Sequence, residues 1–423
     1  IFTAPIEKGP TRNLTRSSDA HDKWARWSPD GSRIAFVSDM SGEDEIYLVA
    51  QDGASAPEPL TSNGEMMRYA PEWSPDGERL AFADKSGRLF VIEVDSGAMV
   101  EAARDPRDQI RNYTWSPNGG HLAFTMSTEA DFGSVHVWSV ADGQLRQVTS
   151  DMFNEFDVAW DPEGNYLYYL SDRAYAPQIS SIEWNFATDR ETFIYALALR
   201  SDVPHPLPAE SDEVTLDDDE NEGEDEAGED DEESKSKAHL HIDFDGLGDR
   251  VTRLPIEADN YGGLSANKGH VLYVEGGPFY YGRESDIEPT LHVFSLEDRE
   301  AKALAEGIDG YALSADGEKV LVGQNGGYML YEARGNGGDS AKEVSTEGLV
   351  VDRIPTEEWV QIFQEVWRRY RDFFYVDNMH GYDWEALRSQ YEPWLEHVAH
   401  RSDLNYVIGE MIAELAVGHA YIQ

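Results

Sequence analysis

The chain has 423 residues and a formal net charge of −48 at neutral pH, because 82 acidic residues outnumber 34 basic ones. Binding to nucleic acid or to an anionic membrane surface needs clustered Lys and Arg, so this composition predicts neither partner. The chain contains no cysteine, which excludes disulfides, Cys-ligated metals and a thiol nucleophile. No apolar run is long enough to cross a bilayer, so we expect no membrane insertion.

A five-residue segment, Trp-Ser-Pro-Asp-Gly at residues 27–31, recurs along the chain. Further copies begin at Trp73, Trp115 and Trp160 and, in weaker form, at Leu264 and Leu313. The first four copies are spaced by 46, 42 and 45 residues. A period of about 40 to 50 residues is typical of propellers and solenoids.

Each copy predicts the same local structure. Pro-Asp-Gly forms a tight turn, in which Pro sets φ and Gly takes the position that needs a positive φ. Two alternating strands follow, for example at 33–37 and 45–49, and then a turn such as Asp52-Gly53 and an edge strand. This pattern predicts one four-stranded blade per copy. We interpret the repeated Trp as core filling between blades and not as a functional site.

In chain order, the first segment, residues 1–15, is predicted to form only part of a blade. Residues 1–15 form a predicted outer strand with the ending Arg-Asn-Leu-Thr, which resembles the endings of later blades. This partial blade and the six complete copies predict a mainly β fold, with a seven-bladed β-propeller over residues 1–345. Because the first blade lacks its inner strands, we also expect further residues upstream of Ile1.

An acidic segment at residues 209–238 interrupts the propeller pattern. Between Asp212 and Glu233 it carries 15 acidic and no basic residues, with no apolar periodicity. Such a composition cannot bury enough apolar surface to fold, so we predict a disordered insertion within one blade. Loose binding of divalent cations or of a basic partner is the functional alternative, although the segment lacks the spacing of a calcium-binding loop.

After a linker at 346–355, the apolar period changes from 2 to 3.6 residues, which predicts helices. The first is capped by Thr356 and carries an apolar stripe. A second helix starts at Asp383, and a third starts at Ser402 and ends near Gly418. The stripe of the first helix comprises Trp359, Ile362, Phe363, Val366, Trp367, Tyr370 and Phe373. Stripes this apolar need a partner surface, so residues 356–423 are predicted to begin a second domain.

No complete catalytic motif is present. The chain has no His-Glu-x-x-His, no phosphate-binding Gly-rich loop, no dinucleotide fingerprint and no Gly-x-Ser-x-Gly elbow. The absent elbow argues against a propeller joined to an α/β-hydrolase, and so does the helical character of the segment after the propeller. No cofactor or metal is predicted.

The C-terminal segment resembles the first core subdomain of tricorn-type serine peptidases. The resemblance is carried by Phe374-Tyr375-Val376, by His380-Gly381-Tyr382-Asp383-Trp384, by the run from Glu410 to Leu415, and by His419-Ala420-Tyr421-Ile422. The preceding repeats resemble the second, seven-bladed propeller of that family. The resemblance covers essentially the whole chain apart from the acidic segment, and it implies that the helices open an α/β peptidase core.

This resemblance implies that His419 is the general base of a Ser-His catalytic set. The family's nucleophilic Ser, its supporting Glu and its PDZ-like domain would then lie downstream of this chain. The family often has Ser directly before this His, helping to orient the ring, whereas this chain has Gly418. A structural reading stays open, in which His419 is a helix-end residue interacting with the helix dipole.

The resemblance predicts a serine endopeptidase that degrades oligopeptides, with the propeller gating access to the site. It implies peptide substrates, a homo-oligomeric ring formed through further domains, and a cytoplasmic location, with a periplasmic one as the alternative. The competing hypothesis is a non-catalytic, TolB-like propeller that acts as a protein-binding module. The sequence that follows Gln423 discriminates between the two.

Overall fold

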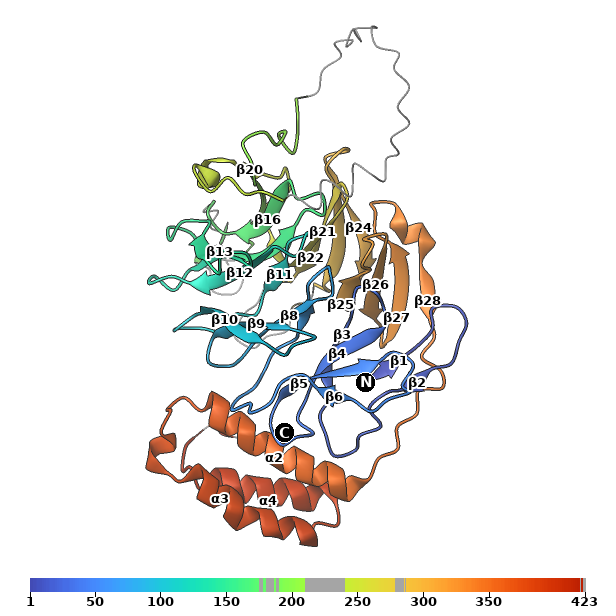
Figure 1. Ribbon diagram of the computed structural model, residues 1–423, viewed down its shortest axis with the longest axis vertical. Helices are drawn as coiled ribbons and strands as arrows, with labels where there is room; N and C mark the ends of the chain where they lie inside the picture. The colour runs from blue at the N-terminus through green and yellow to red at the C-terminus, as the bar shows by residue number, and fades with distance from the viewer. Residues whose placement is uncertain are drawn as a thin grey trace. The chain divides into compact units, whose positions relative to one another are not determined.

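The computed structural model describes residues 1–174, 190–209, 240–277, 285, 287–418 and 420, together with the backbone at 178–179 and 186–187. Figure 1 traces the chain in colour from its N-terminus to its C-terminus and labels its helices and strands. The chain divides into two compact units. The first unit comprises Ile1–Trp73, Gly77–Gln109 and Thr346–Gln423, and the second comprises Ser74–Asp76 and Ile110–Ser345. The predicted acidic insertion lies outside the described residues, apart from its first residue, and so does His419.

The first unit contains two antiparallel four-stranded sheets, blades I and II, and one two-stranded sheet. Blade I consists of β3 (Lys23–Trp27), β4 (Arg33–Ser38), β5 (Glu45–Ala50) and β6 (Glu58–Pro59). Blade II consists of β7 (Glu72–Trp73), β8 (Arg79–Ala83), β9 (Arg88–Glu93) and β10 (Met99–Arg104). The two-stranded sheet pairs β1 (Phe2–Thr3) with β2 (Arg12–Asn13).

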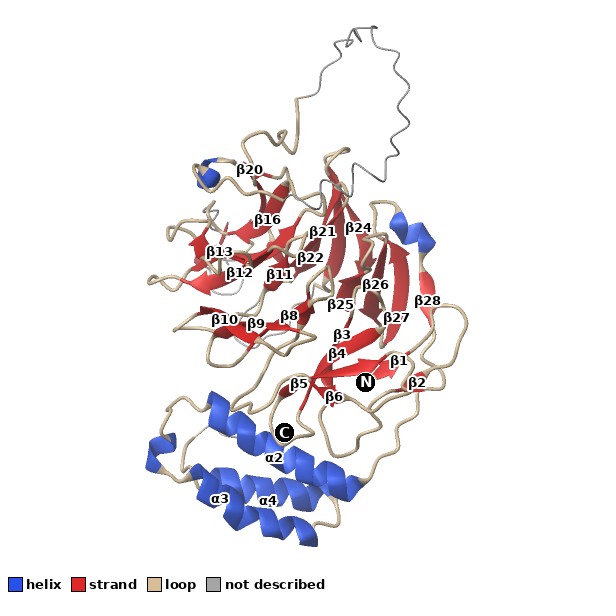
Figure 2. Cartoon of the chain, in the orientation of Figure 1, coloured by secondary structure: helices blue, strands red, loops and turns tan. Residues whose placement is uncertain are grey.

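The second unit contains four more four-stranded sheets, blades III to VI (Figure 2). Blade III is β11 (Tyr113–Trp115), β12 (His121–Ser127), β13 (Gly133–Ser139) and β14 (Leu145–Gln147). Blade IV is β15 (Glu155–Trp160), β16 (Tyr166–Ser171), β19 (Phe193–Ala198) and β20 (Val251–Arg253), with β17 (Gln178–Ile179) pairing with β18 (Phe186–Ala187) between its strands. Blade V is β21 (Asn260–Asn267), β22 (His270–Gly276), β23 (Thr290–Ser295) and β24 (Glu300–Glu306), and blade VI is β25 (Ile308–Leu313), β26 (Lys319–Gln324), β27 (Gly327–Glu332) and β28 (Lys342–Val344).

The prediction of seven blades is wrong, because the described residues form six. The segment expected to supply an incomplete seventh blade forms only β1 and β2, which are two residues long and pair only with each other. Its Leu14 is buried with Ile34 and Phe36 of blade I. Residues 1–15 therefore make a short hairpin whose end packs on blade I, and the mainly β, propeller-type fold contains six blades.

The repeated pentapeptide forms the turn that the sequence predicts. In blade I, Ser28 Oγ donates to Asp30 Oδ1 at 2.6 Å and accepts the backbone N–H of Arg33 at 3.0 Å. Gly31 has φ of +68°, which L side chains adopt at a cost. The hydrogen bond from Ser28, together with those from the backbone and side chain of Ser32, lowers the pKa of Asp30 to about 2. Ser314 and Asp316 repeat the contact at 2.5 Å in blade VI.

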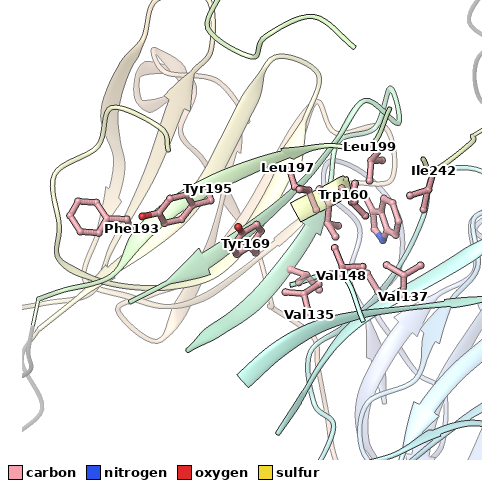
Figure 3. Packing of buried hydrophobic residues seen from close by; sticks show 14 residues of the cluster. Val135, Val137, Val148, Trp160, Tyr169, Phe193, Tyr195, Leu197, Leu199 and Ile242 are labelled. Atoms are coloured by element: carbon pink, nitrogen blue, oxygen red, sulfur yellow. The ribbon is translucent and has the colours of Figure 1, made fainter. Parts of the chain in front are cut away.

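Three of the four repeated Trp residues are buried, and hydrogen bonds from Trp73 and Trp160 to the preceding blade place these two between blades, as predicted. Trp73, Trp115 and Trp160 are 9%, 7% and 6% exposed, whereas Trp27 is 52% exposed. Trp160 Nε1 donates to the carbonyl of Thr114 in the preceding blade at 3.0 Å. Figure 3 shows its indole among apolar side chains of blades III and IV. The core-filling role of Trp73 and Trp160 thus includes a contact with the preceding blade.

Three α-helices follow the blades in the first unit: α2 (Pro355–Phe373), α3 (Trp384–Tyr391) and α4 (Arg401–Ala413). Their own apolar core contains Phe363, Trp367, Leu404 and Ile408 and no blade residue. Short 3₁₀ turns complete the described helical structure: η1 (Leu247–Asp249), η2 (Gly337–Ser340), η3 (Met379–Gly381) and η4 (Glu392–His397). Within the described residues, no helix is long and apolar enough to cross a membrane.

The predicted helix starts need two corrections. The N-cap of α2 is Ile354, with Pro355 as the first helical residue, and not Thr356. Pro suits this position because its missing N–H would have no intrahelical partner there. α4 begins at Arg401, one residue before the predicted start at Ser402, because His400 caps it and forms a capping box with Asp403. It ends at Ala413, before the predicted end near Gly418. The third prediction is confirmed, since Asp383 caps α3 and accepts the N–H of Ala386 at 2.9 Å.

Candidate functional site

The residue predicted to be catalytic, His419, lies outside the described residues, but its neighbours Gly418 and Ala420 are described. Ala420 packs against the helical core. A Cβ added at Gly418 would meet open space, and the backbone there lies outside the left-handed region. The Ser that the family often has at this position would therefore fit without strain.

The turn after α4 leads the chain to Gly418. Leu415 is 1% exposed and anchors the turn in the helical core. Glu414 accepts the hydroxyl hydrogen of Tyr391 at 2.8 Å, which ties the turn to the end of α3. Burial and this bond raise the pKa of Tyr391 to about 12. Ala416 has φ of +50°, so the turn holds a residue in a conformation that its side chain disfavours.

An open depression of about 660 Å³ lies at this turn. Residues 415–418 form one wall, and the side chains of Tyr375, His380 and Tyr382 belong to the other. The Tyr375 hydroxyl and His380 Nε2 are 2.5 Å apart, and the His380 ring lies edge-on to that of Phe374 at 5.5 Å. These contacts lie within the segment 374–382 and connect its two ends.

The loop that carries His380 is strained. Met379 and His380 have φ of +49° and +56°, followed by Gly381 at +86°. Two successive non-glycine residues with positive φ are uncommon, and such strain is concentrated at functional sites in proteins. The buried side chain of Met379, 6% exposed, holds the loop against the helical core.

The helical segment is attached to blade I by charged side chains. The Arg368 guanidinium, on α2, is buried and donates to the carbonyl of Gly42 at 2.8 Å and to Asp39. Arg371 forms two hydrogen bonds to Glu43, at 2.6 and 2.9 Å. Such bidentate Arg–carboxylate pairs fix orientation as well as contributing energy. The junction therefore holds α2 in one defined geometry on blade I.

A histidine–carboxylate pair completes this junction. His21 Nδ1 lies 2.8 and 2.9 Å from the two oxygens of Glu365. The hydrogen bond with Glu365 raises the pKa of His21. Burial acts to raise the pKa of Glu365, but hydrogen bonds from His21 and Gln361 outweigh it and hold that pKa well below its usual range. The fold thus favours a charged pair at this place.

In the described part of the chain, no three His, Asp or Glu residues are grouped closely enough to hold a metal ion. The structure brings together Tyr375, His380 and Tyr382 with the residues just before His419, which sequence reasoning did not identify as a site. The available signal was the polar and aromatic cluster 374–382 between two predicted helices, since functional residues concentrate on loops.

Two family profiles match the chain in sequence order. The first, described as the tricorn protease second beta propeller domain, matches residues 1–334. The second, described as the tricorn protease C1 domain, matches residues 355–413. The first region contains strands β1 to β27, and the second contains helices α2 to α4.

Curated relatives carry the same family name. The chain is 25% identical over 98% of its length to tricorn protease homolog 1 of Streptomyces coelicolor, and it spans 40% of that protein. It is 23% identical over its whole length to a tricorn protease homolog of Saccharolobus solfataricus, of which it spans 37%. The chain thus covers about two fifths of the length of these relatives.

A solved structure shares the fold. The crystal structure of the tricorn protease superposes on 95% of this chain with a TM-score of 0.77 at 18% sequence identity, and the match covers 38% of that protein.

Proposed function

Because this chain belongs to the tricorn protease family, we propose that it forms the second propeller and the start of the core of a serine-type peptidase that degrades oligopeptides. One observation carries the proposal: a propeller of this family is followed directly by the family's first core subdomain. A propeller alone is compatible with many functions, so the match of residues 355–413 to the tricorn protease C1 domain is the more informative one.

In the proposed mechanism, His419 is the general base. Its neutral imidazole takes the proton of a Ser hydroxyl, which is a poor nucleophile until then, and later gives a proton to the leaving amine. We propose that this Ser lies outside the present chain, which spans about two fifths of the length of its relatives. Backbone N–H groups there would stabilise the oxyanion.

The propeller supports this chemistry by restricting entry. We propose that its axial channel admits unfolded peptides, that the protein assembles as a homo-oligomer through further domains, and that it works in the cytoplasm. Cell fractionation with an antibody to the chain tests the location, and a periplasmic signal would contradict it.

The decisive experiment is His419→Ala in the complete protein, assayed with internally quenched oligopeptides. Loss of a triad-type base lowers kcat by roughly 10⁴ to 10⁶-fold, while the melting temperature stays nearly unchanged. His397→Ala is the matched control, since His397 is an exposed histidine on η4 of the same segment, and it should keep full activity. A drop in stability with activity following it would assign His419 a structural role.

Two further measurements sharpen the test. The chain of 423 residues alone should hydrolyse no peptide and should not react with a serine-directed phosphonate; strong labelling would place the nucleophile within it. Gly418→Ser, which the open space at Gly418 accommodates, should raise kcat in the complete protein if a Ser there orients the imidazole. A complete protein with no hydrolysis and no labelling would favour the alternative, a TolB-like binding module.

A further inference from the structure

A groove between α2 and blade I is the feature from which we infer a binding site. This junction groove has a volume of about 390 Å³, which lies in the usual range for ligand pockets. Asp19, Asp39, Met40 and Gly42 form one side of it, and α2 forms the other. Ligand pockets often lie where two folded parts of a protein meet, as this one does.

The side formed by α2 is long. Its lining residues follow one face of the helix over about three turns: Thr356, Glu357, Val360, Gln361, Gln364 and Arg368. A helix rises about 1.5 Å per residue, so this side extends for about 18 Å. An extended peptide advances about 3.3 Å per residue, so about five residues fit along it. The length of the junction groove therefore favours a peptide segment over a small molecule.

The groove offers hydrogen-bond acceptors to a peptide backbone. Gln361 donates through Nε2 to Asp39 at 2.9 Å, and Gln364 donates through Nε2 to Glu392 at 2.7 Å. These bonds hold both amide groups in place, and among the described residues no donor contacts either amide oxygen. Each oxygen can therefore accept a backbone N–H of a bound chain.

Apolar side chains line the groove from both sides. Met40 follows β4 of blade I and is 38% exposed, and Val360 lies on α2 and is 43% exposed. Removing such apolar surface from water stabilises a complex. The two side chains therefore favour a peptide that carries apolar groups.

The charges of the groove select the sign of the ligand. Asp39 is paired with the buried guanidinium of Arg368. Asp19 and Glu357, one on each side, have no basic partner among the described residues, and Glu357 accepts only the hydroxyl hydrogen of Ser18. Glu357 also lies in the first turn of α2, where its charge offsets the positive end of the helix dipole. The two carboxylates therefore attract cationic groups and repel anionic ones.

We propose that the junction groove binds an extended peptide segment in which basic side chains stand next to apolar ones. Because the bound segment contacts both α2 and blade I, it also stabilises the attachment of one to the other by mass action. This binding does not depend on the proposed peptidase chemistry, since the groove shares no lining residue with the turn that precedes His419.

The test measures the binding of fluorescein-labelled peptides to the complete protein by fluorescence anisotropy at physiological salt. The protein carries His419→Ala, so that the proposed peptidase activity does not consume the peptides, and mass spectrometry checks that they stay intact. Three peptides share the sequence Leu-x-Leu-x-Leu and carry Arg, Gln or Glu at both x positions. The Arg peptide should bind about tenfold tighter than the Gln peptide, and the Glu peptide more weakly than either.

Variants of the groove test its two free carboxylates. Glu357→Gln should weaken binding of the Arg peptide by about three- to fivefold, and the double variant Asp19→Asn with Glu357→Gln by about tenfold. Glu357→Lys should shift the preference towards the Glu peptide, because it replaces an attractive charge by a repulsive one.

Glu358→Gln is the matched control, since it removes the same charge from the same turn of α2. Glu358 pairs with Arg353 and does not line the groove. The control should change binding by less than about twofold, because salt screens charges outside the site.

Equal weakening by Glu357→Gln and Glu358→Gln would mean that the acidic surface in general holds the peptide, and it would overturn the site. Equal binding of the three peptides would overturn it too, and so would equal affinities for arginine amide and the Arg peptide. Hydrolysis by the wild-type protein is measured separately, so a failure of binding leaves the proposed peptidase function intact.

Discussion

Two interfaces of this protein differ in the chemistry of their contacts, since one is apolar and the other is charged. Between blades III and IV, the contact consists of buried apolar side chains such as Val137, Leu167 and Leu197, around the indole of Trp160 (Figure 3). Between blade I and α2, the contacts are ion pairs and hydrogen bonds, led by Arg368 and Arg371. Blades III and IV share one hydrophobic core. Blade I and α2 belong to separate hydrophobic cores, because the core of the helices contains no blade residue.

The difference indicates that blades III and IV form one folded unit, whereas the helices and blade I are two folded parts that contact each other. Apolar burial is non-directional and changes little with pH, so it suits blades that must remain packed. Charged contacts require a defined geometry and respond to pH and salt, and interfaces between domains are typically more polar than cores. The contact between α2 and blade I has this second character. The following predictions test that distinction.

The largest loss of stability is expected from Trp160→Ala. This substitution removes a buried indole from the apolar interface and should lower the free energy of unfolding by about 3–5 kcal/mol at any pH between 5 and 8. Urea denaturation measures it. The matched control is Trp27→Ala, because Trp27 occupies the same place in the repeat but is 52% exposed, and it should cost less than about 1 kcal/mol. Equal losses for both variants would contradict the assignment.

A smaller loss of stability is expected from Arg368→Met, which removes an ion pair between α2 and blade I. The substitution leaves the Asp39 carboxylate, whose side chain is 3% exposed, without its guanidinium and should cost about 3 kcal/mol. The double variant Arg368→Met with Asp39→Asn should recover much of the loss, since it leaves no unpaired buried charge. Limited proteolysis of residues 346–423 measures the attachment. A double variant no more stable than the single one would show that Asp39 is not the group left unpaired.

The smallest effect is the pH dependence contributed by His21 and Glu365. Because the fold raises the pKa of His21, its stabilisation is complete below the ordinary value of 6.5 and is lost as the pH rises through the folded value. Because the fold lowers the pKa of Glu365, its stabilisation is present above the ordinary value of 4.5 and is lost in acid. Lys23, Asp39 and Arg369 are the other charged groups near this pair.

The melting temperature of the wild type should therefore exceed that of His21→Gln most clearly between about pH 5 and 6, by no more than about 2 °C, because the pair is partly exposed. The difference should shrink as the pH rises above 6.5 and through the raised pKa of His21 in the folded protein. His397→Gln serves as the control and should show no such pH profile. A constant difference across this range would mean that His21 acts through packing and not through charge.

The sequence by itself determined the features that depend on neighbouring residues. The turn at Ser28, Asp30 and Gly31 needs only residues within five positions, so the repeat predicts it wherever it occurs. The strands within each blade and the cap of α3 at Asp383 follow from local periodicity and local hydrogen bonds in the same way. The family resemblance also depended on contiguous residues, and it was confirmed over both matched regions.

Only the tertiary structure decided the features that depend on contacts between residues far apart in the sequence. Six blades form in the described residues because β1 and β2 pair with each other, a choice that local pattern does not determine. Trp27 and Trp160 occupy the same place in the repeat but are 52% and 6% exposed, because burial depends on residues distant in the sequence. His21 and Glu365 are 344 residues apart, and Tyr382 meets residues 415–418 only when α3 and α4 pack together. Contacts at such separations arise from chain folding as a whole, and no local propensity encodes them.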